Sequence, residues 1–69
     1  MTYIVLIERG PTSYGASVPD LPGCVAAGKT LEEVLQLIQE AIRFHLEGLK
    51  EAGLPIPLPT TVCMTAVEV

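Results

Sequence analysis

Short apolar runs alternate with turn residues over the first part of the chain, and the spacing then becomes helical. Residues 2–9 are rich in β-branched and aromatic side chains, which favours a strand. The run from Gly10 to Ser13 is typical of a turn, and residues 14–18 have the pattern of a returning strand, so the two segments predict a hairpin. With a short third strand over residues 24–27, the pattern predicts an antiparallel meander.

One long helix is predicted to follow, with Thr30 as its N-cap and its end near Ala52. The run from Thr30 to Glu33 has the form of a capping box, in which Thr30 caps the first turn and Glu33 reaches back to the cap amide. Gly53 follows at the position where helices commonly stop. One helix face is apolar and is expected to pack on the sheet; it contains Leu31, Val34, Leu35, Ile38, Ile42, His45, Leu46 and Leu49.

Two bulky residues of the helix, Leu37 and Phe44, lie on the shoulder between its apolar and polar faces. They are neighbours of Ala41 and Gly48 on the helical wheel. Two interpretations are open: the pair edges a wide core face, or it forms a second contact stripe for another subunit or a partner protein. Leu37 and Phe44 are therefore the candidate interface residues.

The most specific local motif is the run of residues 18–24, VPDLPGC, between the second and third predicted strands. Pro19 and Pro22 lack N–H donors and restrict the residues before them to extended conformations. Gly23 is expected to adopt a backbone conformation that other residues resist. Asp20 is expected to accept hydrogen bonds from amides of the turn. These four residues predict a fixed structural turn.

The C-terminal part begins with residues 54–59, in which proline alternates with aliphatic residues and keeps the backbone extended. This segment is expected to lie along the surface as a strap; the alternative is a recognition motif for a proline-binding domain. Residues 61–69 predict a final strand with apolar side chains on both faces. Residues 1–69 thus predict one α+β domain, with a three-stranded antiparallel sheet, one long helix and a fourth strand.

Composition changes this picture by suggesting partners. The 69 residues are 49% hydrophobic, more apolar material than one small core can hide, so a homodimer or homotetramer is expected. The net charge is −4 and the four basic residues are scattered, which argues against direct nucleic-acid binding. Such acidity suits a basic protein partner or ordinary solubility. We expect a cytoplasmic protein, because no run approaches the roughly 18 apolar residues of a membrane span and no basic leader opens the chain.

Catalysis has little support in the sequence. His45, the one histidine, falls on the apolar helix face and is expected to be a core or interface residue. Cys24 and Cys63 are expected to be reduced, buried thiols, and Cys24 has no basic neighbour to activate it. A nuclease site needs several convergent carboxylates, whereas Glu8 and Asp20 are the main candidates outside the helix. We therefore predict a non-enzymatic protein without metal or cofactor.

Several of these motifs together resemble the HicB-like antitoxin family. The resemblance extends over residues 3–59 and rests on the residues Tyr14, Val18-Pro19-Asp20-Leu21-Pro22-Gly23-Cys24, Gly28-Lys29-Thr30, Glu32-Glu33, Ala41, Gly53 and Leu54-Pro55-Ile56-Pro57. It implies a β-β-β-α-β arrangement described as a partial ribonuclease H-like fold. It also implies that the domain neutralises a small basic ribonuclease toxin, HicA, by masking the active-site histidine of that toxin.

Many members of this family also carry a C-terminal DNA-binding module that represses their own operon. This sequence stops at Val69, directly after the predicted fourth strand, so we expect a short form without that module and without autorepression. The alternative to an antitoxin is a stand-alone oligomeric scaffold or ligand-responsive module that has no toxin partner.

Overall fold

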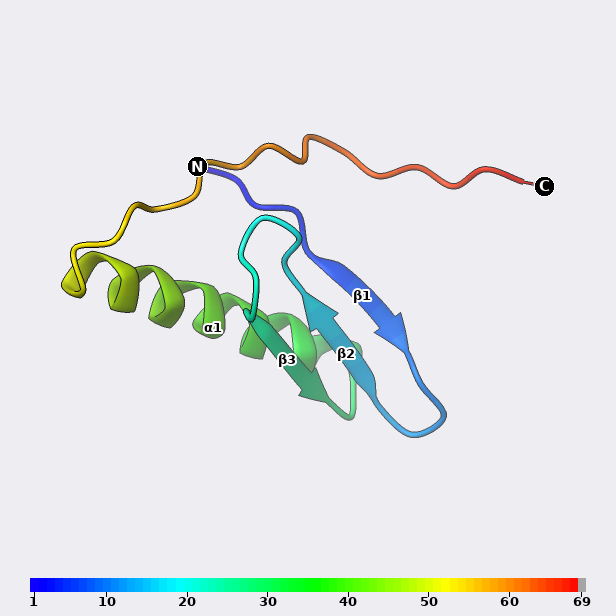
Figure 1. Cartoon of the computed structure of the whole chain (residues 1–69). Helices are drawn as coiled ribbons and strands as arrows, with labels where there is room; N and C mark the ends of the chain where they lie inside the picture. Colours follow the sequence, from blue (N-terminus) through cyan, green and yellow to red (C-terminus); the bar gives the residue numbers. More distant parts are fainter. Residues whose placement is uncertain (69) are drawn as a thin grey trace.

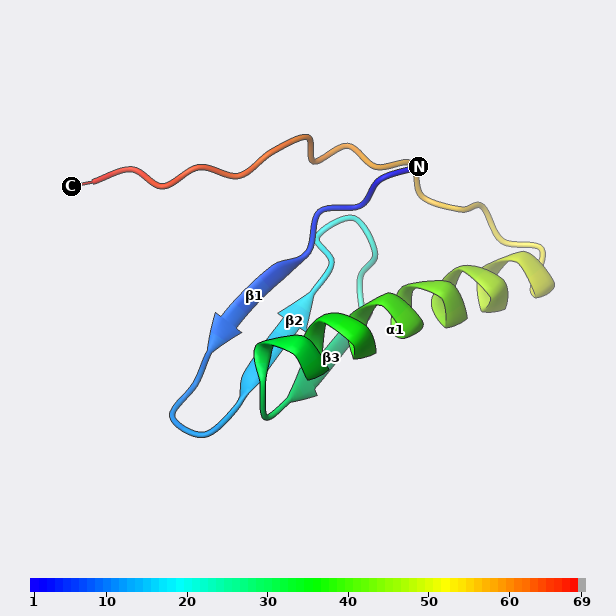
Figure 2. The same cartoon turned by 180° about the vertical axis from the view of Figure 1, so that it is seen from behind.

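The computed structural model describes residues 1–68, which form three strands followed by one helix. The strands are β1 (Leu6–Arg9), β2 (Tyr14–Ser17) and β3 (Val25–Gly28), and the helix is α1 (Leu31–Glu51). The sheet is antiparallel with the order β1-β2-β3, so β1 and β3 are its two edges. The helix crosses one face of the sheet, as the two opposite views show (Figures 1 and 2). The predicted α+β class, meander and long helix are confirmed.

Strand register assigns the side chains to two different faces of the sheet. Ile7, Ala16 and Ala26 are opposite one another across the three strands, and Ala16 and Ala26 belong to the core beneath α1. Because side chains alternate along a strand, Gly15 and Ala27 lie on the other face, which no helix covers. In this row of the open face, β2 and β3 therefore contribute only small residues.

Within residues 1–68, the buried hydrophobic core has six residues: Ala16, Val18, Leu21, Cys24, Val34 and Ile38. Half of them come from the VPDLPGC turn, which is closed by backbone hydrogen bonds from the Leu21 N–H to the Val18 carbonyl and from the Cys24 N–H to the Leu21 carbonyl, both 3.1 Å. Leu21 is completely buried. The turn is thus more than a connection, because it folds an apolar plug into the space between the sheet and the helix.

The helix begins where the sequence predicts. Thr30 is extended, and its Oγ1 accepts a hydrogen bond of 3.0 Å from the Glu33 N–H. Only this half of the capping box forms: the Glu33 side chain lies against Gly28, where a Cβ added to the glycine would meet its Cγ at 3.2 Å. At the other end the Ala52 N–H bonds back to the Gly48 carbonyl, and Gly53 has φ +70°.

The buried stripe of α1 is narrower than the sequence predicts. Val34 and Ile38 are buried, but Leu31 and Leu35 are 47% and 38% exposed. The other apolar positions, from Ile42 to Leu49, are only half-buried. The half-burial of these later positions is geometric, because a helix of 21 residues is longer than strands of four residues and its C-terminal part extends past the sheet (Figure 1). Leu31 and Leu35 lie at the helix start, where α1 packs on β2 and β3 but not on β1.

Two predicted strands differ from the structure. The first is shorter than residues 2–9 because its partner β2 ends at Ser17, which pairs with Leu6, so residues 2–5 have no neighbour in the sheet. The second, expected over residues 61–69, is not formed over residues 61–68, and Val69 lies outside the described residues. Strand propensity alone did not decide these segments, because a strand also requires a paired partner.

Candidate protein-binding surface

An exposed apolar surface runs along the free edge of β3 and the adjoining shoulder of α1. We call it the helix–strand surface and define it by Val25, Ala27, Leu37, Ala41 and Phe44. Phe44 is 80% exposed and Val25 is 64% exposed. Exposed aromatic residues next to small neighbours are typical of protein contact sites. Leu37 and Phe44, the two candidate interface residues, are both exposed rather than buried at the edge of the core.

Two shallow hollows flank the Phe44 ring. One of about 510 Å³ lies between α1 and the end of the turn and is lined by Gly23, Cys24, His45 and Leu49 among others. A second of about 530 Å³ lies over β3 and is lined by Ala27, Leu37 and Glu40 among others. Phe44, Val25 and Ala41 line both hollows. The ring therefore stands as a knob between two depressions, a shape suited to interlocking with another protein.

The helix that carries this surface is acidic. The helix carries five glutamates against two basic side chains, a net charge of −3 out of the −4 of the whole chain. Glu40 itself lines the second hollow. An apolar knob beside an acidic helix favours a partner with an apolar pocket and a basic rim.

Asp20 does not bond the turn amides that the sequence suggested. Its Oδ2 accepts the backbone N–H groups of Thr60 and Thr61 at 3.2 and 3.1 Å, and its Oδ1 accepts the hydroxyls of the same residues at 2.8 and 3.2 Å. The Thr61 N–H is the largest cause that lowers the pKa of Asp20, and the Thr60 hydroxyl adds to it. We call this contact the Asp20 latch. The Leu21 and Cys24 amides of the turn instead donate to backbone carbonyls.

The other predicted turn residues lie on the outside of the plug. Pro19, Pro22 and Gly23 are exposed, and Gly23 has φ +84°. Nothing lies within 4 Å of a Cβ built on Gly23, so the backbone conformation and not crowding calls for glycine there. These three residues set the backbone conformation of the turn, and their surroundings do not suggest a ligand site.

The structure does not give Cys24 the surroundings of a reactive nucleophile. Cys24 is buried, and desolvation raises the pKa of its thiol, the opposite of what a reactive thiolate needs. Cys63 was expected to be buried but is exposed, because its segment is not in the sheet. His45 is half-buried beside Cys24 in the first hollow. Within residues 1–68, no cluster of three or more His, Cys, Asp or Glu side chains could hold a metal.

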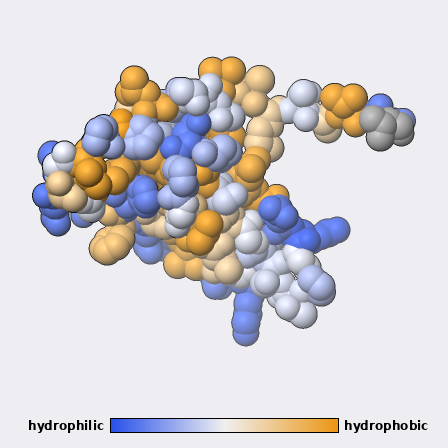
Figure 3. All heavy atoms as spheres, viewed as in Figure 1, coloured by the Kyte–Doolittle hydropathy of each residue, from blue (hydrophilic) through white to orange (hydrophobic). Residues whose placement is uncertain are grey.

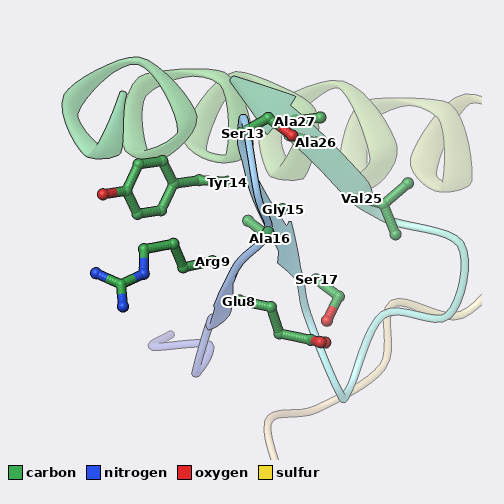
Figure 4. A pocket seen from close by; sticks show the side chains of 11 residues that line it. Glu8, Arg9, Ser13, Tyr14, Gly15, Ala16, Ser17, Val25, Ala26 and Ala27 are labelled. Atoms are coloured by element: carbon green, nitrogen blue, oxygen red, sulfur yellow. The ribbon is translucent and has the colours of Figure 1, made fainter. Parts of the chain in front are cut away.

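A third hollow, of about 460 Å³, lies at the sheet itself. In Figure 4 the Arg9 and Tyr14 side chains point to one side of the strands, whereas those of Glu8, Ser17 and Val25 point to the other. Gly15 and the alanines leave it flat and open. Its lining contains one acidic and one basic side chain, a pattern without the convergent groups that catalysis or metal binding requires.

Sequence reasoning missed the β3 half of the helix–strand surface and the partners of Asp20. Val25 and Ala27 read as ordinary strand residues, and only the sheet order shows that they lie on an edge beside Phe44. Thr60 and Thr61 are 40 and 41 residues from Asp20, so no local pattern signals the latch.

Separately, no helix in the described part of the chain is long and apolar enough to cross a membrane.

Comparisons with known proteins identify relatives for nearly the whole chain. A family model described as the HicB-like antitoxin of bacterial toxin–antitoxin systems matches residues 3–68. An uncharacterized 14.9 kDa protein of Haemophilus phage HP1 is 46% identical over 57 residues, which are 83% of this chain and 43% of the phage protein. Antitoxin HicB 2 of Photorhabdus laumondii is 33% identical over 69 residues, 100% of this chain and 50% of that protein. The chain thus spans half or less of the length of these two relatives.

The fold also matches a solved structure. A chain of a HicA3 and HicB3 toxin–antitoxin complex superposes with a TM-score of 0.75 at 30% identity, covering 87% of this chain and 70% of that one. The family model and this structural match agree with the family resemblance stated from the sequence. The chain therefore belongs to the HicB-like antitoxin family of bacterial toxin–antitoxin systems.

Proposed function

We propose that this chain neutralises a small basic HicA-type ribonuclease in the cytoplasm by covering the active site of that toxin. The chain acts by binding and performs no catalysis of its own. The proposal is supported by family membership and by the likeness to a chain of a HicA3 and HicB3 complex.

The single observation that carries the proposal is the exposed knob of Phe44 on an acidic helix. An aromatic side chain that is 80% exposed lowers the solubility of the monomer and contributes nothing to the monomer's core. At a protein interface the same ring would be buried in a pocket and would contribute much of the binding energy. We therefore assign toxin binding to the helix–strand surface.

The acidic residues of α1 would complement the basic toxin. Complementary charge raises the association rate and fixes orientation more than it raises affinity, and salt screens it. Binding should therefore weaken as ionic strength rises. A partner held only by apolar contact would show little salt dependence.

The test is a binding titration between the purified full chain and a catalytically inactive HicA-type toxin. Phe44→Asp should weaken binding by at least about tenfold, because it removes the buried ring and adds a desolvation penalty. The matched control is Leu58→Asp, since Leu58 is 72% exposed on the proline-rich segment and outside the helix–strand surface. Both variants should keep the circular dichroism spectrum of the parent.

Two results would contradict the proposal. If the parent chain does not bind the toxin at low salt, the antitoxin role is wrong and a stand-alone module without a toxin becomes the better description. If Phe44→Asp and Leu58→Asp bind as well as the parent, the role stands but the assigned surface is wrong.

A further inference from the structure

Two strand-like segments of this chain have no partner in the sheet. Residues 2–5 continue β1 beyond the point where β2 ends. Residues 61–68 form no strand, although four of the eight are β-branched and none is glycine or proline. Such segments pair readily with a free strand edge, because extended backbone outside a sheet has N–H and C=O groups without ladder partners; the Thr61 N–H, which donates to Asp20, is the exception.

The chain is fixed up to Thr61 and then departs from the domain. The Tyr3 hydroxyl donates to the Pro57 carbonyl, and the Asp20 latch holds Thr60 and Thr61. Beyond this point both views show the segment projecting away from the sheet (Figures 1 and 2). The latch therefore presents residues 62–68 outward and does not lay them against the β1 of their own chain.

The projecting segment is apolar and exposed. Val62, Met64 and Val67 are 85%, 57% and 78% exposed, and orange side chains along the segment are visible in Figure 3. Glu68 carries its only charge among residues 61–68. An exposed apolar segment with strand propensity promotes aggregation unless another strand or surface covers it.

The matching acceptor is the outer edge of β1. The sheet order places β1 at an edge, and its Ile7 is 37% exposed. Residues 2–9 and residues 61–68 have the same length of eight residues, and both are rich in β-branched side chains. Pairing the two segments would use the whole first strand that the sequence predicts, not only Leu6–Arg9.

We propose that residues 61–68 of one chain add as a strand to residues 2–9 of a second copy, and that the two copies exchange these segments reciprocally. Reciprocal exchange closes a two-fold dimer, because each copy donates one strand and accepts one, so that neither donor segment is left over to recruit a third copy. A second copy fits better than a basic toxin, since the segment has almost no charge to offer such a partner. The inference does not rest on the proposed function.

This assignment separates the two surfaces of the molecule. The dimer would use the β1 edge, whereas the helix–strand surface lies at β3, the opposite edge of the sheet. Self-association and toxin binding would therefore occur together without competition.

Cross-linking through the native Cys63 of the full chain tests the proposal directly. Cys63 is exposed on the donated segment and Cys24 is buried. Thr2→Cys and Glu8→Cys place exposed thiols at the two ends of the acceptor, so one of them should be near Cys63 whether the strands run parallel or antiparallel. Ala27→Cys on β3 is the matched control at the opposite edge.

With a short bismaleimide reagent, Thr2→Cys or Glu8→Cys should give a product of twice the chain mass in excess of the parent and of Ala27→Cys. A product at the mass of one chain would show that the segment pairs within its own molecule and would overturn the proposal. A cross-linked dimer formed through Ala27→Cys alone, or no product in excess of the parent, would also overturn it.

Sedimentation equilibrium gives a second, independent readout. Thr65→Pro removes a backbone donor from the middle of the donated strand and should weaken dimerisation by at least about tenfold. Thr65→Ala keeps the donor and is the matched control. Thr65 is exposed outside the sheet, so neither substitution disturbs the monomer fold. Equal dimerisation by both variants would contradict strand exchange.

Discussion

The conformation of Gly23 gives the sharpest test of how the turn builds the core. The turn supplies Val18, Leu21 and Cys24 to the core, and Gly23 closes it with φ +84°. A Cβ added to Gly23 meets no heavy atom within 4 Å, so a substitution there has a purely conformational cost. For an L-residue the left-handed region costs about 1–2 kcal/mol.

The expected loss of stability can be worked from two opposing effects. Gly23→Ala incurs the left-handed penalty but recovers about 0.4–1 kcal/mol because alanine restricts the unfolded chain. The net loss should be about 1 kcal/mol. Gly23→Val should lose about 1–3 kcal/mol, since a β-branched residue resists this conformation more strongly. Gly23→Asn should lose least, because asparagine tolerates positive φ.

Gly15 provides the matched control. A Cβ on Gly15 also meets nothing within 4 Å, but its φ is not in the left-handed region. Gly15→Ala should therefore be neutral or stabilise the chain by about 0.4–1 kcal/mol. Urea unfolding followed by circular dichroism at one fixed protein concentration measures the series. If Gly23→Ala is no less stable than Gly15→Ala, the reasoning about the turn is refuted.

Three further predictions concern the helix cap, the plug and the latch. Thr30→Ala should lower stability by about 0.5–2 kcal/mol through loss of the cap to the Glu33 N–H, measured by urea unfolding against Thr30→Ser, which should change little. Leu21→Ala should lower the free energy of unfolding by about 2–5 kcal/mol, because it leaves a cavity at a fully buried site. A loss below about 1 kcal/mol in the same assay would contradict the role of the turn in the core. Asp20→Asn should speed hydrogen exchange at the Thr60 and Thr61 amides without unfolding the domain. Because the folded-state pKa of Asp20 is lowered, the latch is fully formed above the ordinary aspartate value of 3.8 and is lost as the pH falls through the lower folded value. Exchange at these amides that is already fast at neutral pH would contradict the latch.

Features governed by neighbouring residues were predicted well from the sequence. The helix start at Thr30 follows from a cap that needs only residues within one turn, and the structure places it there. The meander follows from turn chemistry between closely spaced apolar runs, and its order β1-β2-β3 is confirmed. In each case the physical cause and the sequence signal lie within a few residues of each other.

Features governed by distant residues were predicted poorly. Asp20 was assigned to the nearest amides, whereas its partners Thr60 and Thr61 become available only after the helix has reversed the chain. The final strand was predicted from the strand propensity of residues 61–69. In the structure of the single chain, residues 61–68 do not pair with either edge of the sheet. Likewise, the hydrophobic wheel marks Leu31 and Leu35 as core positions, but α1 packs on β2 and β3 and not on β1, and both residues stay exposed. Composition and pattern record how much apolar surface exists, and topology decides which part of it is covered.

The structure divides the excess apolar residues between two separate exposed regions, which composition alone does not show. One part lies at β3 and the shoulder of α1, the helix that carries most of the negative charge, and the other lies along β1 and residues 61–68, where Glu8, Arg9 and Glu68 are the charged residues. An acidic helix suits a partner of opposite charge that must be reached quickly and selectively, whereas an edge strand whose two charges cancel and a nearly uncharged segment suit a copy of the same chain. If both assignments hold, Thr65→Pro should separate the copies and leave toxin binding intact, and Phe44→Asp should do the reverse. A variant that loses both activities without unfolding would show that the two edges are energetically coupled, and that toxin binding requires the dimer.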